Sequence, residues 1–167
     1  DQFGFSVAVN KEGDILAVGA RLDDLNGSNS GEVTVYKWNG TAWVQYGNAI
    51  VGEFADDNFG WDVALNADGD RLVVGAQDSD AGGANSGQVR VYAYDSGVWV
   101  QLGADLNGQA ADDRFGYSVD VNAKGDRIVV GALLNDANGS NSGQVRIYEL
   151  TNGTWVQLGA ALDGELA

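Results

Sequence analysis

Short runs of alternating and of continuous hydrophobic residues follow one another along the chain, separated by turns rich in Gly, Asn and Asp. Residues 3–9 alternate hydrophobic with small or polar side chains, which is typical of a strand with one buried face. Residues 15–20 form an unbroken hydrophobic run, which predicts a strand covered on both faces. Residues 32–36 alternate again, and residues 43–45 are short and partly polar, as expected of an outer edge. The pattern therefore predicts four short strands.

The same pattern occurs three times at a spacing of 56 residues, with no insertion or deletion. Phe3-Gly4, for example, returns as Phe59-Gly60 and Phe115-Gly116. The repeat predicts three units. They comprise residues 1–56, 57–112 and 113–167.

Turn signals support a hairpin in every unit. The dipeptides that favour hairpin turns are Asn39-Gly40, Ser96-Gly97 and Asn152-Gly153. Four antiparallel strands in about 50 residues is the size of a propeller blade. We therefore predict an all-β fold of β-propeller blades, three four-stranded antiparallel units that form an incomplete propeller or arc. A β-solenoid is the alternative, but its units are usually shorter and need no hairpin.

Composition narrows the classes of function. The chain contains no Cys and no His, which removes thiolate and imidazole ligands and the usual histidine base. The net charge of -15 repels nucleic acid and anionic membranes and attracts cations. No stretch approaches the roughly 18 consecutive hydrophobic residues of a membrane span. We therefore expect neither nucleic-acid binding nor membrane insertion.

The recurring motifs resemble the FG-GAP repeat family, which occurs in integrin α-subunit propellers and in many bacterial and algal surface proteins. Each unit opens with Phe-Gly and continues with Val-Gly-Ala, as in Val18-Gly19-Ala20, and with Gly-x-Val-x-Val/Ile-Tyr, as in residues 31–36. The Trp-Val-Gln segment resembles the secreted microbial version. The resemblance implies a non-enzymatic propeller in an extracellular or cell-surface protein.

The calcium loop that often lies between the first two strands of integrin-type repeats is not matched. The corresponding loop here, residues 10–14 in the first unit, is too short and too poor in carboxylates to supply six to eight oxygen ligands. The loop between the second and third strands is richer in oxygen donors. Its equivalent residues Asp24, Asp80 and Asp136 are candidate calcium ligands, and the alternative is that they cap the backbone in Asx turns.

Other carboxylates recur in every unit. Asp1, Asp57 and Asp113 precede Phe-Gly, and the residues after the first turn are Asp14, Asp70 and Asp126. Paired carboxylates could act as glycosidase acid and base. An active site needs one asymmetric constellation, however, so repetition favours a structural role and we predict no enzyme.

Two tryptophans and four asparagines are candidates for surface roles. Trp38 and Trp61 are not repeated as Trp, so they are the better candidates for ligand contacts, against the alternative of packing. Candidate glycosylation sequons begin at Asn26, Asn39, Asn138 and Asn152. Glycans would follow only in a eukaryotic secretory protein.

These features predict a non-enzymatic extracellular or cell-surface module for adhesion or structural assembly. The alternative is a carbohydrate-binding, lectin-like propeller; a hydrolase is a third, weaker candidate, and a reconstructed repeat protein a fourth. Because propellers close with about 4–8 blades, we expect the chain to be a window from a larger propeller or assembly. The expected partners are further blades or other copies of the chain, together with a protein or glycan ligand.

Overall fold

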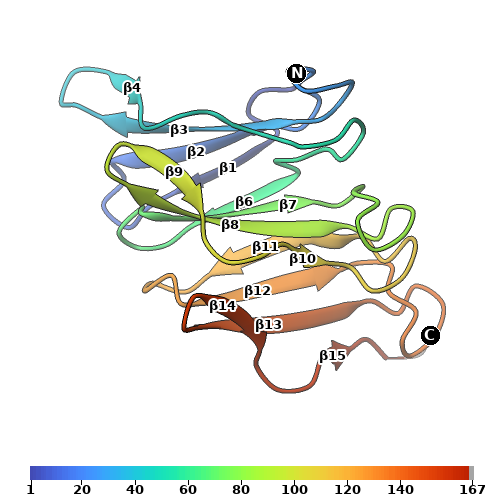
Figure 1. The fold of residues 1–167 in the computed structure, drawn as a ribbon. Coiled ribbons are helices and arrows are strands. Elements are labelled where there is room, and N and C mark those ends of the chain that lie inside the picture. The colour runs from blue at the N-terminus through green and yellow to red at the C-terminus, as the bar shows by residue number, and fades with distance from the viewer. Residues whose placement is uncertain (166–167) are drawn as a thin grey trace.

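Three antiparallel β-sheets stacked in chain order make up the computed structural model, which describes residues 1–165 (Figure 1). Each sheet lies within one of the predicted units, although the boundaries between units stay a prediction. The last two residues of the third unit lie outside the described part. No helix that could span a bilayer occurs among residues 1–165.

Each sheet contains four main strands and one strand of two residues. The first sheet comprises β1 (Ser6–Val9), β2 (Ile15–Ala20), β3 (Glu32–Trp38), β4 (Trp43–Gln45) and β5 (Ile50–Val51). The second comprises β6 (Asp62–Leu65), β7 (Arg71–Ala76), β8 (Gln88–Asp95), β9 (Val98–Gln101) and β10 (Leu106–Asn107). The third comprises β11 (Phe115–Val121), β12 (Arg127–Ala132), β13 (Gln144–Thr151), β14 (Thr154–Gln157) and β15 (Leu162–Asp163).

The main strands pair in simple up-and-down order, β1-β2-β3-β4 in the first sheet. This confirms the predicted all-β fold of three four-stranded antiparallel blades. The two-residue strand pairs with the third main strand at its other end, as Val33 with Ile50 in the first sheet. Two residues are too few for a recognisable alternation, so the sequence pattern did not predict β5, β10 or β15.

The first strand begins later than expected in the first two sheets. We predicted a strand from Phe3, whereas β1 begins at Ser6 and β6 at Asp62. The backbone turns instead at Phe-Gly, because Gln2 and Gly4 have φ values of 54° and 87° and the Phe5 amide donates to the Gln2 carbonyl at 3.0 Å. This turn directs the Phe-Gly segment of the second unit onto the sheet before it.

The predicted hairpins are present, with one difference. Ser96-Gly97 and Asn152-Gly153 both have positive φ at both residues, as a type I′ turn requires. The first hairpin is longer, because β3 ends at Trp38 and β4 begins at Trp43. There the side-chain oxygen of Asn39 accepts the Thr41 and Ala42 amides at 2.9 Å each.

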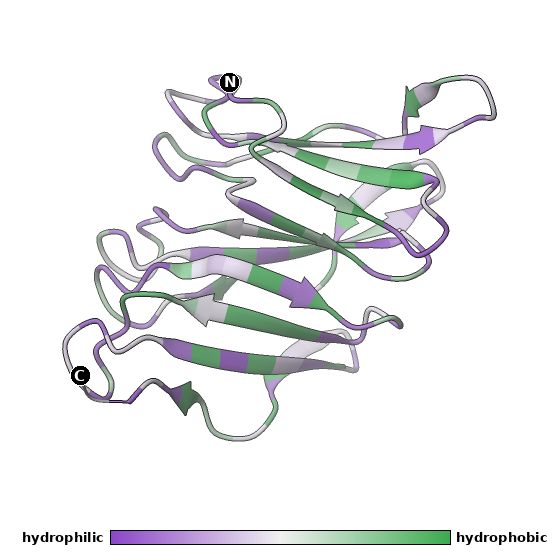
Figure 2. Cartoon of the chain, turned by 180° about the vertical axis from the view of Figure 1, so that it is seen from behind, coloured by the Kyte–Doolittle hydropathy of each residue, from purple (hydrophilic) through white to green (hydrophobic). Residues whose placement is uncertain are grey.

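The hydrophobic core lies between the sheets. One cluster joins the first two sheets and contains Val33, Val35, Phe59, Leu72 and Val74. A second cluster joins the second and third sheets in the same way. Figure 2 shows hydrophilic and hydrophobic residues alternating along β13, beside the C-terminal end. Each fully buried side chain of this size contributes about 1.5–3 kcal/mol, so these two layers dominate the stability.

Burial on the middle strands depends on a neighbouring sheet. Val73 on β7 is fully buried between two sheets, as predicted for a strand covered on both faces. Its equivalent Val129 on β12 is 41% exposed. The first strands show the same dependence, because Val63 on β6 is 5% exposed and its equivalent Val7 on β1 is 62% exposed. The outer faces of the first and third sheets are therefore hydrophobic surfaces open to solvent.

Candidate functional site

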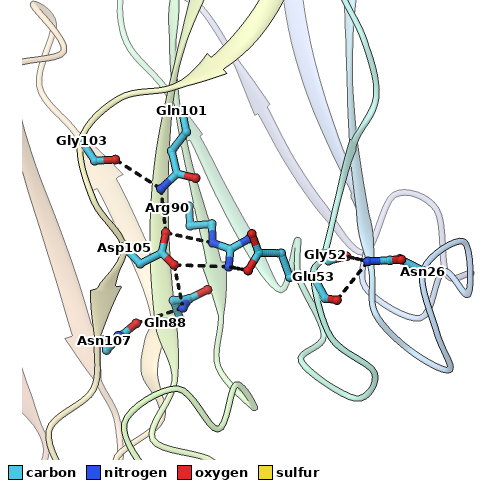
Figure 3. A network of polar contacts seen from close by, with 9 residues as sticks. All are labelled: Asn26, Gly52, Glu53, Gln88, Arg90, Gln101, Gly103, Asp105 and Asn107. Carbon is cyan, nitrogen blue, oxygen red and sulfur yellow. Dashed lines mark hydrogen bonds and ion pairs between the residues drawn. The ribbon is translucent and has the colours of Figure 1, made fainter.

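A polar network crosses the junction between the first two sheets (Figure 3). Arg90 on β8 has a side chain only 3% exposed, and its guanidinium pairs with Glu53 at 2.6 Å and with Asp105 at 3.2 Å. Glu53 belongs to the segment that leaves the first sheet. The same segment accepts hydrogen bonds from the Asn26 amide, through Gly52 at 3.0 Å and Glu53 at 2.9 Å. The network therefore links both sheets to a loop of the first.

The network continues within the second sheet. Asp105 accepts a hydrogen bond from the Gln101 amide at 2.6 Å, and Gln88 donates to Asn107 at 2.9 Å. Burial raises the pKa of the nearby Tyr92 to about 12, against the opposing effect of Arg90. The tyrosine therefore stays neutral at physiological pH, and the charge at this junction is carried by Arg90 and its two carboxylates.

A small cavity of about 360 Å³ lies beside the network, at the edge formed by the β7–β8 loop and the segment after β5. Its lining includes Asp57, Ser79 and Asp80. Burial raises the pKa of Asp57 to about 6, with Ser79 and Arg90 opposing the shift and Asp80 adding to it. A carboxyl group that is half protonated near pH 6 could serve as a proton donor in this cavity.

The candidate calcium ligands lie at the same edge but in separate loops, one in each unit. Each accepts a short hydrogen bond from a backbone amide within its own loop. The pairs are Asp24 with Asn29 at 2.7 Å, Asp80 with Asn85 at 2.7 Å, and Asp136 with Asn141 at 2.6 Å. Residues 1–165 hold no group of three or more acidic side chains arranged to bind a metal ion. This geometry suits the backbone-capping alternative, and calcium binding stays a prediction.

The two candidate ligand-contact tryptophans are far apart in strand order. Trp61 lies just before β6, in a row of rings that runs along the first strands of the three sheets, β1, β6 and β11. The centroid of its ring is 5.1 Å from that of Phe5 and 5.7 Å from that of Tyr117. The Arg21 guanidinium covers the row, 4.7 Å from the Trp61 ring. We call Phe5, Trp61 and Tyr117 the inner aromatic row. Its members are equivalent residues at 56-residue spacing, so the sequence held a signal for it.

Trp38 ends β3 at the outer side of the first sheet and is 41% exposed. Its ring centroid lies 5.7 Å from that of Trp43 on β4. The structure therefore does not bring Trp38 and Trp61 into one site.

The four candidate glycosylation residues are all exposed, as a glycan acceptor must be. Two of them use the amide nitrogen that a glycan would occupy. Asn26 donates to the segment after β5, and Asn138 donates to the Gly164 carbonyl at 2.8 Å. Asn39 and Asn152 lie in hairpin turns. Glycosylation stays a prediction at all four.

The carboxylates that follow the turn between the first two strands take part in a set of hydrogen bonds that holds this turn. The sequence did not lead us to predict these hydrogen bonds. In the second unit the side-chain oxygen of Asn66 accepts the Asp70 and Arg71 amides at 3.0 Å each, and its amide donates to the Asp70 carboxylate at 2.9 Å. Asn10 with Asp14 and Asn122 with Asp126 form the same contacts. The Asn-x-x-x-Asp spacing in all three units was the available signal.

Comparison with known proteins agrees with this architecture. No curated protein is similar enough in sequence to be matched. Solved structures with a similar fold include a putative 6-phosphogluconolactonase from Bacteroides uniformis, with a TM-score of 0.61, 15% identity, and coverage of 92% of this chain and 39% of that one. The β-propeller domain of Cps50 (Swd1) from Myceliophteria thermophila gives a TM-score of 0.59 at 14% identity, over 92% of this chain and 36% of that one.

A third similar structure is KlAtg21, solved in complex with the coiled coil of AgAtg16, with a TM-score of 0.55, 9% identity, and coverage of 96% of this chain and 58% of that one. The chain thus spans between 36% and 58% of the length of these structures. At such low identities the likeness concerns the fold alone, which is that of β-propeller blades.

The family model for the FG-GAP repeat matches three segments, residues 1–36, 49–92 and 106–148. Together they cover more than half of the chain, and each begins near a unit boundary and ends at or near the tyrosine of the third main strand. The match coincides with the Phe-Gly turns and the strand glycines described above. The chain therefore belongs to the FG-GAP repeat family.

Proposed function

We propose that this chain is a non-enzymatic extracellular or cell-surface β-propeller module that serves adhesion or structural assembly. The observation that carries the proposal is that the repeated polar residues hold the blades and their turns together. Asn66 and Asp70 lock a turn, and Arg90 joins two sheets. Asn10 with Asp14 and Asn122 with Asp126 make the same turn contacts. Arg146, the third-unit equivalent of Arg90, donates to Gln109 of the second unit at 2.8 Å. The repeated polar residues therefore support blade architecture and leave the surface for binding.

The proposed location rests on the family and on charge. FG-GAP repeats are typical of extracellular and surface proteins. A net charge of -15 keeps a protein soluble in salty surroundings, where screening relieves self-repulsion. Both considerations support an extracellular or cell-surface module.

The non-enzymatic part rests on the family as well. Propeller repeats of the FG-GAP type are generally non-enzymatic. The similar structure named as a putative 6-phosphogluconolactonase shares 15% identity, which extends the likeness no further than the fold. Asp57 and Asp80 both line the small cavity, but each has equivalents in the other two units, so they are repeated features and not one asymmetric constellation.

An attachment assay tests adhesion. Beads coated with the chain should attach to immobilised cell-surface extracts more than beads coated with an unrelated protein of similar net charge. The comparison at matched charge is needed because nonspecific attraction to cations would act on both. Equal attachment of the two kinds of bead would contradict the proposed role.

Carbohydrate binding is the second candidate function, and the inner aromatic row favours it. Aromatic rings present flat apolar faces, and Arg21 adds hydrogen-bond donors beside them. On a glycan array, Trp61→Ala should lose any sugar signal that the unaltered chain gives, whereas Trp38→Ala at the outer side should keep it. An array without any sugar signal would leave this second function without support.

Calcium binding by the loops of Asp24, Asp80 and Asp136 is a separate proposal with a direct test. A melting temperature that rises on addition of calcium and returns with a chelator would support it, provided that Asp80→Asn reduces the shift. An unchanged melting temperature would leave these carboxylates as acceptors for backbone amides only.

A further inference from the structure

The Phe-Gly dipeptide of each later unit inserts into the preceding sheet. The Phe59 amide donates to the Ser30 carbonyl at 3.1 Å, and the Phe115 amide donates to that of Ser86 at 2.9 Å. Both rings are buried, with 1% and 0% exposed. We call the receiving site the Phe-Gly socket. It consists of Gly19, Ser30-Gly31 and Gly52 in the first sheet, and of Gly75, Ser86-Gly87 and Gly108 in the second.

Glycine is required in the socket because two backbones meet there. A Cβ at Gly19 would collide with the carbonyl oxygen of Gly60, and a Cβ at Gly75 with that of Gly116. The strand glycine therefore has a partner-dependent role: it admits the backbone of the next unit.

The third sheet carries the same socket without an inserted dipeptide. Gly131, Ser142, Gly143 and Gly164 line an open cavity of about 530 Å³ on its outer face, the larger of the two cavities described here. A Cβ at Gly131 would come close only to the rotatable hydroxyl of Ser118 and its neighbouring atoms. The socket is thus formed by the chain itself and open to a further Phe-Gly segment.

The matching dipeptide lies at the other end of the molecule. The Phe3 side chain is 61% exposed, and no atom would lie within 4 Å of a Cβ at Gly4. Gly4 nevertheless has a φ of 87°, as do the inserted Gly60 and Gly116 at 86° and 87°. Phe3-Gly4 therefore already has the backbone conformation of an inserted dipeptide.

A second pair of complementary features lies at the outer side of the sheets. At the internal junctions the indole nitrogens of Trp99 and Trp155 donate to carbonyls of the preceding sheet at 2.8 Å each. Each indole packs on a glycine, which is Gly103 for Trp155. At the two ends of the molecule these features have no partner. Trp43, the equivalent of Trp99 in the first sheet, is 43% exposed. Gly159, the equivalent of Gly103 in the third sheet, would have no atom within 4 Å of a Cβ.

We propose that a second copy of this chain fills the open socket, so that two copies associate head to tail with Phe3-Gly4 of each in the socket of the other. The number of copies follows from closure. This 167-residue segment supplies three blades, fewer than the roughly 4–8 with which propellers close. Two copies of the segment supply six blades, and three copies would exceed that range. Two heterologous junctions then form a closed dimer. This inference rests on the proposed role in structural assembly.

The new junction should be weaker than the internal ones. At the first internal junction Arg90 pairs with Glu53, and at the second Arg146 donates to Gln109 at 2.8 Å. At the new junction the equivalent residues are Thr34 in one copy and Glu165 in the other, and the arginine is missing. Both copies are also strongly acidic. Association should therefore depend on concentration.

The mass in solution is the first test. Sedimentation of the 167-residue chain should show twice the 17.5 kDa of one copy. Gly131→Ala, whose added Cβ would collide with the incoming Gly4 carbonyl, and Phe3→Ala should each give a monomer. Val156→Ser is the control, because its equivalent Val100 is 50% exposed even between two sheets. A monomeric unaltered chain, an open-ended polymer or a dimeric Gly131→Ala variant would overturn the proposal.

Disulfide trapping tests the direction of the contact in a chain that has no cysteine. At the internal junctions the Lys11 amide donates to the Ala67 carbonyl, and the Ala67 amide to that of Ala123, at 3.2 Å each. The double variant Lys11→Cys with Ala123→Cys should therefore form a covalent dimer on oxidation. Lys11→Cys with Ala67→Cys should form an intrachain bond instead. A covalent dimer from either single variant at the same rate would contradict head-to-tail packing.

The two proposals fail in different ways. If dimerisation is wrong, the sedimentation mass is that of a monomer, while bead attachment is unaffected. If adhesion is wrong, beads do not attach although the dimer and its disulfide form as expected. Beads coated with Gly131→Ala separate the two effects in one experiment.

Discussion

Single asparagines hold the turn between the first two strands of every sheet. Asn66 is 1% exposed, and its amide group satisfies two backbone amides and one carboxylate at once. The equivalent Asn122 makes the same contacts but is exposed. The pair thus separates the effect of the hydrogen bonds from the effect of their burial.

We expect Asn66→Ala to lower the free energy of unfolding by about 2–3 kcal/mol, because buried amides lose their acceptor and gain no water. Asn122→Ala should cost clearly less, since water can replace the lost acceptor there. Urea unfolding of both variants measures the difference. Equal losses would mean that burial of the turn does not matter.

Asp57 is the residue whose ionisation should affect stability most. Burial raises its pKa to about 6 from an ordinary value of 3.8. The folded protein therefore holds this proton more tightly than the unfolded chain, and the stability that the neutral group contributes is complete below about pH 4 and lost as the pH rises through 6.

Replacement by Asn removes this dependence. Between pH 4 and pH 7, the free energy of unfolding of Asp57→Asn should rise by on the order of 1–3 kcal/mol relative to that of the unaltered chain. Thermal unfolding across that range, with the exposed Asp68→Asn as the control, measures the gain. A constant difference between Asp57→Asn and the unaltered chain would show that the carboxyl group is not buried as described.

At the scale of the elements, each sheet is held to the next by its connecting segment. The segment after β5 supplies Glu53 to Arg90 and then the Phe-Gly turn, so one stretch of backbone provides both the polar and the hydrophobic part of the junction. The strand pattern predicted the sheets themselves. It did not predict Arg90, because an arginine between Val89 and Val91 also fits a strand with one solvated face.

We expect Arg90→Met to lower the free energy of unfolding by about 1–3 kcal/mol, because Glu53 and Asp105 lose their cation while the methionine keeps most of the volume. The cost stays moderate since both carboxylates reach solvent. Arg127→Met, which breaks the exposed pair with Glu149, should change little. Chemical denaturation distinguishes the two variants, and equal effects would contradict the buried network.

At the scale of the whole molecule, three sheets form two complete junctions and leave half a junction at each end. The burial of equivalent residues differs between a complete junction and an end, because Phe115 is fully buried whereas Phe3 is 61% exposed. An exposed apolar face of this kind favours association. The net charge of -15 opposes it, because two copies repel each other.

The dimer should therefore tighten as sodium chloride rises from about 0.01 to about 0.15 M, over which the Debye length falls from about 30 to about 8 Å. Sedimentation equilibrium at several salt concentrations measures the dissociation constant. Weaker association at higher salt would indicate a junction made by ion pairs, contrary to the apolar contacts inferred here.

The sequence by itself determined the 56-residue repeat, the four main strands, their antiparallel order and the family, because hydrophobic alternation and turn residues act over a few neighbouring positions. Only the tertiary structure decided where the Phe-Gly turn goes, why Gly19 and Gly75 are glycines, and which acidic residues are buried. Those properties arise where backbone from one unit contacts backbone from the next. The pattern of hydrophobic and turn residues within one unit does not predict such contacts. For the same reason Asp24, Asp80 and Asp136 looked alike in the sequence as calcium ligands, whereas their loops show each already accepting a backbone amide.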